Sequence, residues 1–223
     1  MPLETLLDGL RKHSEARLCF YGPPGTGKTA FGQWLARELE KPLLVKRVSD
    51  LIGPYVGETE RNLAQAFQQA REEDAVLMLD EVDSFLRDRR KAQHSWEITA
   101  VNEMLTQMES FQGLFIASTN LMDDLDDASL RRFDLKICFD FLRPEQTIEL
   151  FRHHLQQLKL TPTSAELMPS LGHLSRLTPG DFAMISRRAQ FKPFKDANEV
   201  LEALHAECRL KERGHSRPIG FIH

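Results

Sequence analysis

The sequence has 223 residues, of which 41% are hydrophobic and 28% are charged, which suits one main core with a small second unit. Its net charge of -4 lacks the positive excess with which a dedicated duplex-DNA-binding protein offsets phosphate charge, so nothing favours a nucleic-acid partner. No apolar run approaches the roughly 20 residues of a membrane span, no signal-peptide pattern opens the chain, and three widely spaced cysteines favour a reduced, cytoplasmic setting.

Five short apolar runs have the length of strands and alternate with helical patterns. They span residues 18–21, 43–48, 76–79, 114–117 and 137–141. Runs that are apolar throughout are typical of strands buried on both faces, and their alternation with helices predicts a parallel sheet with crossover helices on both sides. The expected fold class is therefore α/β with a five-stranded parallel sheet. Cys19 and Cys138 fall inside these runs, and we expect both to be small buried side chains.

The pattern changes after residue 142, where strand-like runs stop and helical spacing continues. Helices are expected at 164–171, at 179–190 and from 196 onward, where Asp196 and Glu199 have capping-box spacing. We therefore expect an α/β subdomain over residues 1–142, a helical subdomain over 143–213 and an irregular tail over 214–223.

A phosphate-binding loop follows the first strand-like run and precedes a helical pattern. It consists of Gly22, Pro23, Pro24, Gly25, Thr26, Gly27, Lys28 and Thr29. In such loops glycines let backbone amides turn toward phosphates, the lysine reaches the β and γ oxygens, and the last hydroxyl ligates Mg²⁺. The motif predicts a nucleoside-triphosphate site, with a chance glycine-rich turn as the alternative.

Two adjacent carboxylates, Asp80 and Glu81, end the apolar run at 76–79. Open α/β sheets bind ligands at the carboxyl ends of their strands. Alone, such a pair is more often a helix cap, but beside a phosphate loop it resembles the Walker B motif. We expect Asp80 to hold the Mg²⁺ shell and Glu81 to polarise the attacking water.

Together the motifs resemble the AAA family of AAA+ ATPases, from Leu18 to about Phe191. The segment over residues 80–90 is similar to that of the spastin- and katanin-like members. The resemblance implies a P-loop NTPase core, a small C-terminal helical lid and hydrolysis of Mg-ATP. Few residues precede the first strand-like run, so we expect an ATPase module excised from a longer protein.

Asn120 follows the apolar run at 114–117 and looks like the family's sensor 1, which positions the attacking water. Arg131 and Arg132 resemble the arginine finger, through which one subunit reaches the phosphate held by its neighbour. This implies a homo-oligomeric ring, expected to be a hexamer. The family's commoner form has a further Gly-Arg here, so either arginine or both can be the finger; we expect both, Arg132 first. A solvated basic pair is the alternative.

Tyr55 and Val56 resemble the family's first pore loop, which grips an extended polypeptide, although an ordinary surface tyrosine is the alternative. Residues 89–96 are expected to form a second pore loop. His154 matches a position beside the adenine and ribose, unless it is an ordinary surface or core histidine. Gly180 lies in the sensor-2 region, where glycine lets the backbone approach the nucleotide.

The resemblance implies an ATPase that unfolds, threads or disassembles protein substrates. A rival hypothesis is a nucleotide-dependent switch or scaffold in which ATP controls assembly without threading. A third, a DNA-handling AAA+ protein, predicts a basic ring face that the sequence does not indicate.

Overall fold

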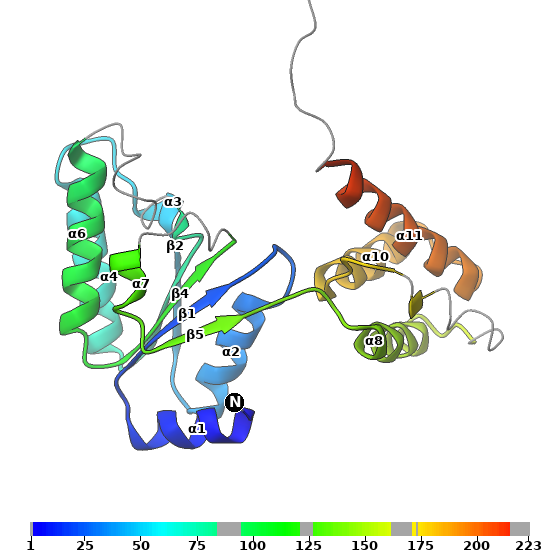
Figure 1. Ribbon diagram of the computed structural model, residues 1–223, viewed down its shortest axis with the longest axis horizontal. Helices are drawn as coiled ribbons and strands as arrows, with labels where there is room; N and C mark the ends of the chain where they lie inside the picture. Colours follow the sequence, from blue (N-terminus) through cyan, green and yellow to red (C-terminus); the bar gives the residue numbers. More distant parts are fainter. Residues whose placement is uncertain (1, 84–94, 121–126, 162–170, 173, 215–223) are drawn as a thin grey trace, which may run out of the picture. The chain divides into compact units, whose positions relative to one another are not determined.

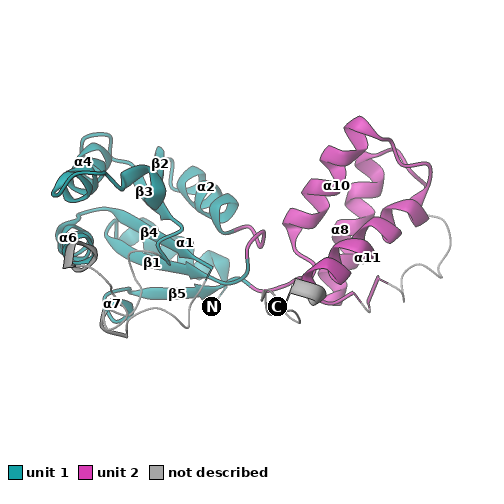
Figure 2. Cartoon of the chain, turned by 90° about the horizontal axis from the view of Figure 1, so that it is seen from above, with its two compact units in different colours: residues 1–23, 28–139 teal, residues 24–27, 140–223 magenta. Residues whose placement is uncertain are grey.

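The computed structural model describes residues 2–83, 95–120, 127–161, 171–172 and 174–214. The chain divides into two compact units, coloured separately in Figure 2. Unit 1 comprises residues 1–23 and 28–139, and unit 2 comprises residues 24–27 and 140–223. The middle of the phosphate loop is therefore grouped with the helical unit.

Unit 1 is a sheet with helices on both faces (Figure 1). Its strands are β1 Ala16–Tyr21, β2 Leu43–Arg47, β3 Val76–Asp80, β4 Leu114–Thr119 and β5 Leu135–Cys138. Its helices are α1 Leu3–Lys12, α2 Lys28–Glu38, α3 Val48–Leu51, α4 Glu58–Glu72, α6 Ser95–Ser110 and α7 Asp127–Leu130. The strand order is β2-β3-β4-β1-β5 and every pairing is parallel, so the prediction of an α/β fold with a five-stranded parallel sheet is confirmed.

The geometry of the strands explains why apolar and polar residues do not alternate in the apolar runs. Successive side chains of a strand point to opposite faces, and here each face meets its own layer of helices. In β3, Leu77 and Leu79 pack with α4 and α6, while Val76 and Met78 pack with α1 and α2. All four side chains are buried.

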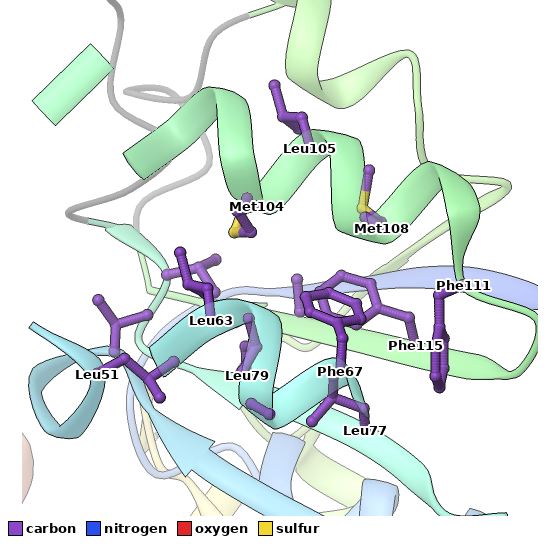
Figure 3. Close-up of a cluster of buried hydrophobic side chains, with 14 of the residues drawn as sticks. Leu51, Leu63, Phe67, Leu77, Leu79, Met104, Leu105, Met108, Phe111 and Phe115 are labelled. Atoms are coloured by element: carbon purple, nitrogen blue, oxygen red, sulfur yellow. The ribbon is translucent and has the colours of Figure 1, made fainter. Parts of the chain in front are cut away.

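The layer between the sheet and helices α4 and α6 is rich in aromatic side chains (Figure 3). The ring of Phe67 in α4 stacks on Phe115 of β4 at 5.3 Å and meets Phe111 edge-on at 5.5 Å. Such pairs stabilise beyond the burial of their area. This layer fixes α6, and Glu109 near the carboxyl end of α6 forms an ion pair with Arg132.

Unit 2 consists of helices α8 Pro144–Gln157, α10 Pro179–Phe191 and α11 Ala197–Gly214 around their own core. Thr178 and Asp181 form a capping box at the start of α10, because Asp181 Oδ2 accepts the Thr178 N–H at 2.7 Å. The buried Asp181 also accepts Lys211 Nζ of α11 at 2.6 Å. The expected cap of α11 is confirmed in part: Asp196 accepts the Glu199 N–H, but the Glu199 side chain accepts the Lys195 N–H instead.

Two expectations about the fold were wrong in detail. The last strand was placed at 137–141, but β5 runs from Leu135 to Cys138, because it pairs only with β1, which ends at Tyr21 opposite Cys138. As an edge strand it alternates between half-buried and exposed side chains, so Cys138 is exposed, whereas Cys19 is buried as expected. The larger part of the predicted helix at 164–171, of the second pore loop at 89–96 and of the predicted tail lies outside the described residues, and residues 95 and 96 belong to α6.

Candidate nucleotide site

The phosphate loop leaves β1 at Gly22, where the backbone admits glycine alone. The φ angle of Gly22 is 133°, and a Cβ there would lie 1.8 Å from the Phe139 carbonyl oxygen. The Phe139 N–H donates to the Tyr21 carbonyl at 2.7 Å, so the chain beyond β5 passes directly against this residue. Sequence reasoning gave this glycine a role in turning amides toward phosphate, and the structure adds a packing requirement.

Lys28 opens α2 with a buried ammonium group. Its Nζ donates to the carbonyl oxygens of Gly22 and Pro23 at 2.7 and 3.0 Å, and to Asn120 Oδ1 at 2.8 Å. Burial lowers the pKa of Lys28, while the negative charges of Asp80 and Asp83 act in the opposite direction. An ammonium group whose direct partners are neutral oxygens is suited to binding an anion.

Thr29 and Asp80 place two oxygen ligands side by side. Thr29 Oγ1 lies 3.0 Å from Asp80 Oδ2, and Asp80 Oδ1 accepts the Ser118 hydroxyl and the Glu81 N–H at 3.1 Å. Mg²⁺ in phosphate sites takes one or two protein oxygens and completes its shell with water and phosphate. Among the described residues there is no group of three or more His, Cys, Asp or Glu side chains that could hold a metal ion.

Glu81 occupies an unusual backbone conformation between two fixed neighbours. Its φ angle is 59°, in the left-handed region that residues with side chains seldom adopt. On one side Asp80 is held by Ser118, and on the other the Val82 N–H donates to the Ser118 carbonyl at 3.0 Å. The Glu81 side chain is exposed at the end of β3, where it is accessible to water.

Asn120 follows the last residue of β4 and is held from two directions. Its side-chain oxygen accepts Lys28 Nζ, and its backbone N–H donates to Asp83 Oδ1 at 3.1 Å. The Thr119 hydroxyl donates to the same Asp83 oxygen. Sequence reasoning gave Asp83 no role, although a third carboxylate three residues after Asp80 was a visible signal.

These side chains meet because their strands are neighbours. β3, β4 and β1 are consecutive in the sheet, and the register sets Tyr21 opposite Thr119 and Leu79 opposite Ala117. All three strands therefore deliver their next residues to the same edge. The structure brings Lys28, Thr29, Asp80 and Asn120 together there, and the roles that the motifs assign to them stay predictions.

Arg131 and Arg132 lie between α7 and β5. The Arg131 side chain is exposed, and the Arg132 guanidinium forms an ion pair with Glu109 near the end of α6. The partner that the structure gives Arg132 is thus a carboxylate of a packed helix, and not a member of the Lys28 group. Sequence reasoning had no means of finding Glu109, because 22 residues of chain separate the pair.

The family model described as "ATPase family associated with various cellular activities (AAA)" matches residues 18–141. The chain belongs to this AAA family. As an AAA ATPase it is an ATP hydrolase with a nucleotide-binding P-loop core. Among the helices of the described ranges, none is long and apolar enough to cross a membrane.

Two kinds of relative resemble this AAA ATPase. Spastin of Drosophila melanogaster is 31% identical over 205 residues, which cover 86% of this chain and 26% of spastin. An uncharacterized AAA family ATPase, y4kL of Sinorhizobium fredii, is 39% identical over 144 residues, 62% of this chain and 43% of that protein. The chain thus spans about a quarter of the length of the spastins that it matches.

The AAA ATPase exposes Tyr55 and Val56 at the tip of a loop before α4. Their side chains are 78% and 97% exposed, which is exceptional for large apolar residues. The base of the loop is fixed: the Gly53 N–H donates to the buried Thr59 hydroxyl at 3.1 Å, and the Asn62 amide donates to the Leu51 carbonyl at 3.0 Å.

Glu58 closes the loop by a reciprocal pair of hydrogen bonds. The Glu58 N–H donates to the Tyr55 carbonyl at 3.1 Å, and the Glu58 carboxylate accepts the Tyr55 N–H at 3.3 Å. The Glu58 side chain lies so close to Gly53 that a Cβ at residue 53 would meet it at 2.4 Å. The loop therefore combines a fixed base with an exposed apolar tip.

His154 and Gly180 belong to unit 2. The His154 ring stacks on Phe182 with centroids 5.3 Å apart, and its Nδ1 lies 2.7 Å from Ser186 Oγ. Burial lowers the pKa of His154 below its usual value, and the neighbouring His153 acts in the same direction. The Gly180 N–H donates to the Gly25 carbonyl at 2.9 Å, and a Cβ at Gly180 would lie 3.0 Å from Gly25 Cα. The predicted roles of both residues beside the nucleotide stay predictions.

Proposed function

We propose that this AAA ATPase binds Mg-ATP on the loop Gly22 to Thr29 and hydrolyses it in a homo-oligomeric ring, expected to be a hexamer, that remodels protein substrates. The observation that carries the proposal is the cluster of Lys28, Thr29, Asp80 and Asn120 at the shared edge of three strands. Its ammonium, hydroxyl, carboxylate and amide groups are those that triphosphate chemistry uses.

Lys28 binds the β and γ phosphates, for which it exchanges its present carbonyl and amide partners. Thr29 and Asp80 would hold Mg²⁺, which neutralises charge on the phosphate oxygens. The Ser118 hydroxyl and the Glu81 N–H orient the Asp80 carboxylate for this task, since both donate to its other oxygen.

Glu81 orients and polarises the attacking water as general base, and the exposure of its side chain supports this role. The Asn120 amide positions the same water beside the γ phosphate. We propose that the adenine side of the nucleotide lies near His154 and Gly180, a role that the resemblance to the AAA family implies for both residues.

The surroundings of the two arginines support a ring, because neither is bound within the Lys28 group of its own chain in the contacts of the described residues. Arg132 is paired with Glu109, and Arg131 is exposed. A second copy would bring its nucleotide to these guanidinium groups, with Arg132 as the principal finger.

Protein remodelling is supported by the Tyr55 and Val56 tip. A rigid aromatic side chain gives apolar contact with little loss of conformational entropy, which suits sequence-tolerant binding of an extended chain. An assembly switch without threading is the competing function, and it makes no use of this tip.

Unfolded casein is a suitable probe to separate the two functions. In Tyr55→Ala we expect basal ATP turnover within about twofold of wild type, because the exposed Tyr55 hydrogen-bonds within its own loop, but no stimulation by casein. Phe191→Ala is the matched control, since Phe191 is an equally exposed aromatic of unit 2. Wild-type stimulation of Tyr55→Ala by casein would count against threading and favour the assembly switch.

A further inference from the structure

Asp83 is a third carboxylate at the active edge of the sheet, and neither the phosphate chemistry nor the metal chemistry described above uses it. It comes three residues after Asp80, directly after the buried Val82. The Val82 N–H is tied to the Ser118 carbonyl of β4, so the chain that carries Asp83 is held against the end of β4.

One oxygen of Asp83 receives two hydrogen bonds from β4 and the residue after it. Asp83 Oδ1 accepts the Thr119 hydroxyl and, at 3.1 Å, the Asn120 N–H. Asn120 lies one residue beyond β4, where its N–H has left the ladder of the sheet. A backbone N–H at such a point needs another acceptor, and a carboxylate is the strongest available.

The consequence lies in the side chain of Asn120. With its backbone fixed, Asn120 directs its amide oxygen at Lys28 Nζ, 2.8 Å away. The contacts run in sequence from the Asp83 carboxylate to the Asn120 backbone, and from the Asn120 amide to the ammonium group that binds phosphate. The charge of Asp83 also acts to raise the pKa of Lys28 against the effect of burial, but the hydrogen bonds of its Oδ1 go to Thr119 and Asn120, so the hydrogen-bonded route from Asp83 to the ammonium group runs through Asn120.

We propose that Asp83 is a positioning residue for hydrolysis, which holds Thr119 and Asn120 so that the Asn120 amide faces the γ phosphate and the attacking water. This inference rests on the proposed role of Asn120. It predicts that Asp83 affects the hydrolytic step and not the affinity for nucleotide, because its partner acts on the water.

The central experiment is a double-mutant cycle of Asp83→Ala and Asn120→Ala in the full chain. Each single variant is expected to lower kcat about tenfold or more while the Kd for ADP, measured by calorimetry, changes less than about threefold. In the Asn120→Ala background, Asp83→Ala should add less than about twofold, because the residue that it positions is already missing.

Two further variants keep the test decisive if Asp83→Ala folds poorly. Asp83→Asn retains an acceptor oxygen and should recover part of the lost kcat, while Thr119→Val removes one donor and should lower kcat less than Asp83→Ala does. Asp74→Asn is the matched control: Asp74 is an exposed aspartate that pairs with Lys41 at 2.6 Å just before β3, and kcat should be unchanged.

Each failure has its own signature. If Asn120→Ala lowers kcat but Asp83→Ala does not, or if the two effects multiply as for independent residues, the positioning role is overturned while the proposed function stands. If Asn120→Ala itself has wild-type kcat, the proposed role of Asn120 fails and the inference about Asp83 fails with it.

Discussion

Arg132→Ala offers the sharpest test of a ring whose sites are shared between copies. The structure separates its two possible effects by size. The Arg132 and Glu109 side chains are 35% and 54% exposed, and a surface ion pair of this kind contributes at most about 1 kcal/mol to stability. An arginine finger contributes on the order of 10³ or more in rate. That factor is equivalent to about 4 kcal/mol of transition-state stabilisation.

We therefore expect Arg132→Ala to keep its Tm within a few degrees of wild type, to bind ATP, and to lose turnover by about 10³-fold. Arg187→Ala is the matched control, because Arg187 is an exposed arginine of α10, and its turnover should be that of wild type.

Mixing two inactive variants shows whether the finger acts between subunits. Lys28→Ala removes the phosphate-binding ammonium but keeps the finger, and Arg132→Ala does the reverse. In an equal random mixture, about one quarter of the interfaces combine an intact loop with an intact neighbouring finger. Turnover plotted against the mixing fraction should rise to a maximum near equal amounts. If turnover at every mixing fraction stays at the level of the separate variants, Arg132 does not act as a finger on the neighbouring subunit.

Two further predictions concern one residue of each unit. Glu81→Gln should retain bound ATP and hydrolyse it at least about 10²-fold more slowly, because the amide cannot take a proton from water. A wild-type hydrolysis rate in a single-turnover assay would show that Glu81 is not the general base. Asp181→Asn should destabilise the protein by about 1–3 kcal/mol, since the buried carboxylate accepts both Thr178 and Lys211, which a lower Tm would report. Asp196→Asn is the control, because Asp196 is an exposed N-cap and asparagine caps a helix equally well, so its Tm should be unchanged. An equal decrease of Tm in both variants would contradict the stabilising role of the buried Asp181 carboxylate.

The parts of this molecule that sequence reasoning predicted are those encoded by neighbouring residues. β3 is apolar throughout because both of its faces are buried, and the phosphate loop is a contiguous motif between a strand and a helix. Asn120 was singled out by its resemblance to sensor 1, and the structure sets it beside Lys28 because the carboxyl ends of parallel strands share one edge.

The residues that escaped prediction act through partners distant in the chain. Asp83 receives its hydrogen bonds from the last residue of β4 and the residue after it, and both β4 and α7 lie between Glu109 and Arg132 in the chain. Cys138 was misjudged because an apolar run does not reveal that its strand lies at the sheet edge, where one face is open. Such pairings follow from tertiary packing, which a linear pattern does not contain.

The loop that carries Tyr55 and Val56 can change in sequence without disturbing the fold. Its fixed base uses Thr59, Asn62 and Glu58, all on α4, whereas the two residues at the tip contribute almost nothing to the interior. Mutations at the tip are therefore nearly free of folding constraints. Two codons can be randomised to alter the proposed binding of polypeptides, while the residues of the Lys28 cluster and the stability of the fold stay unchanged.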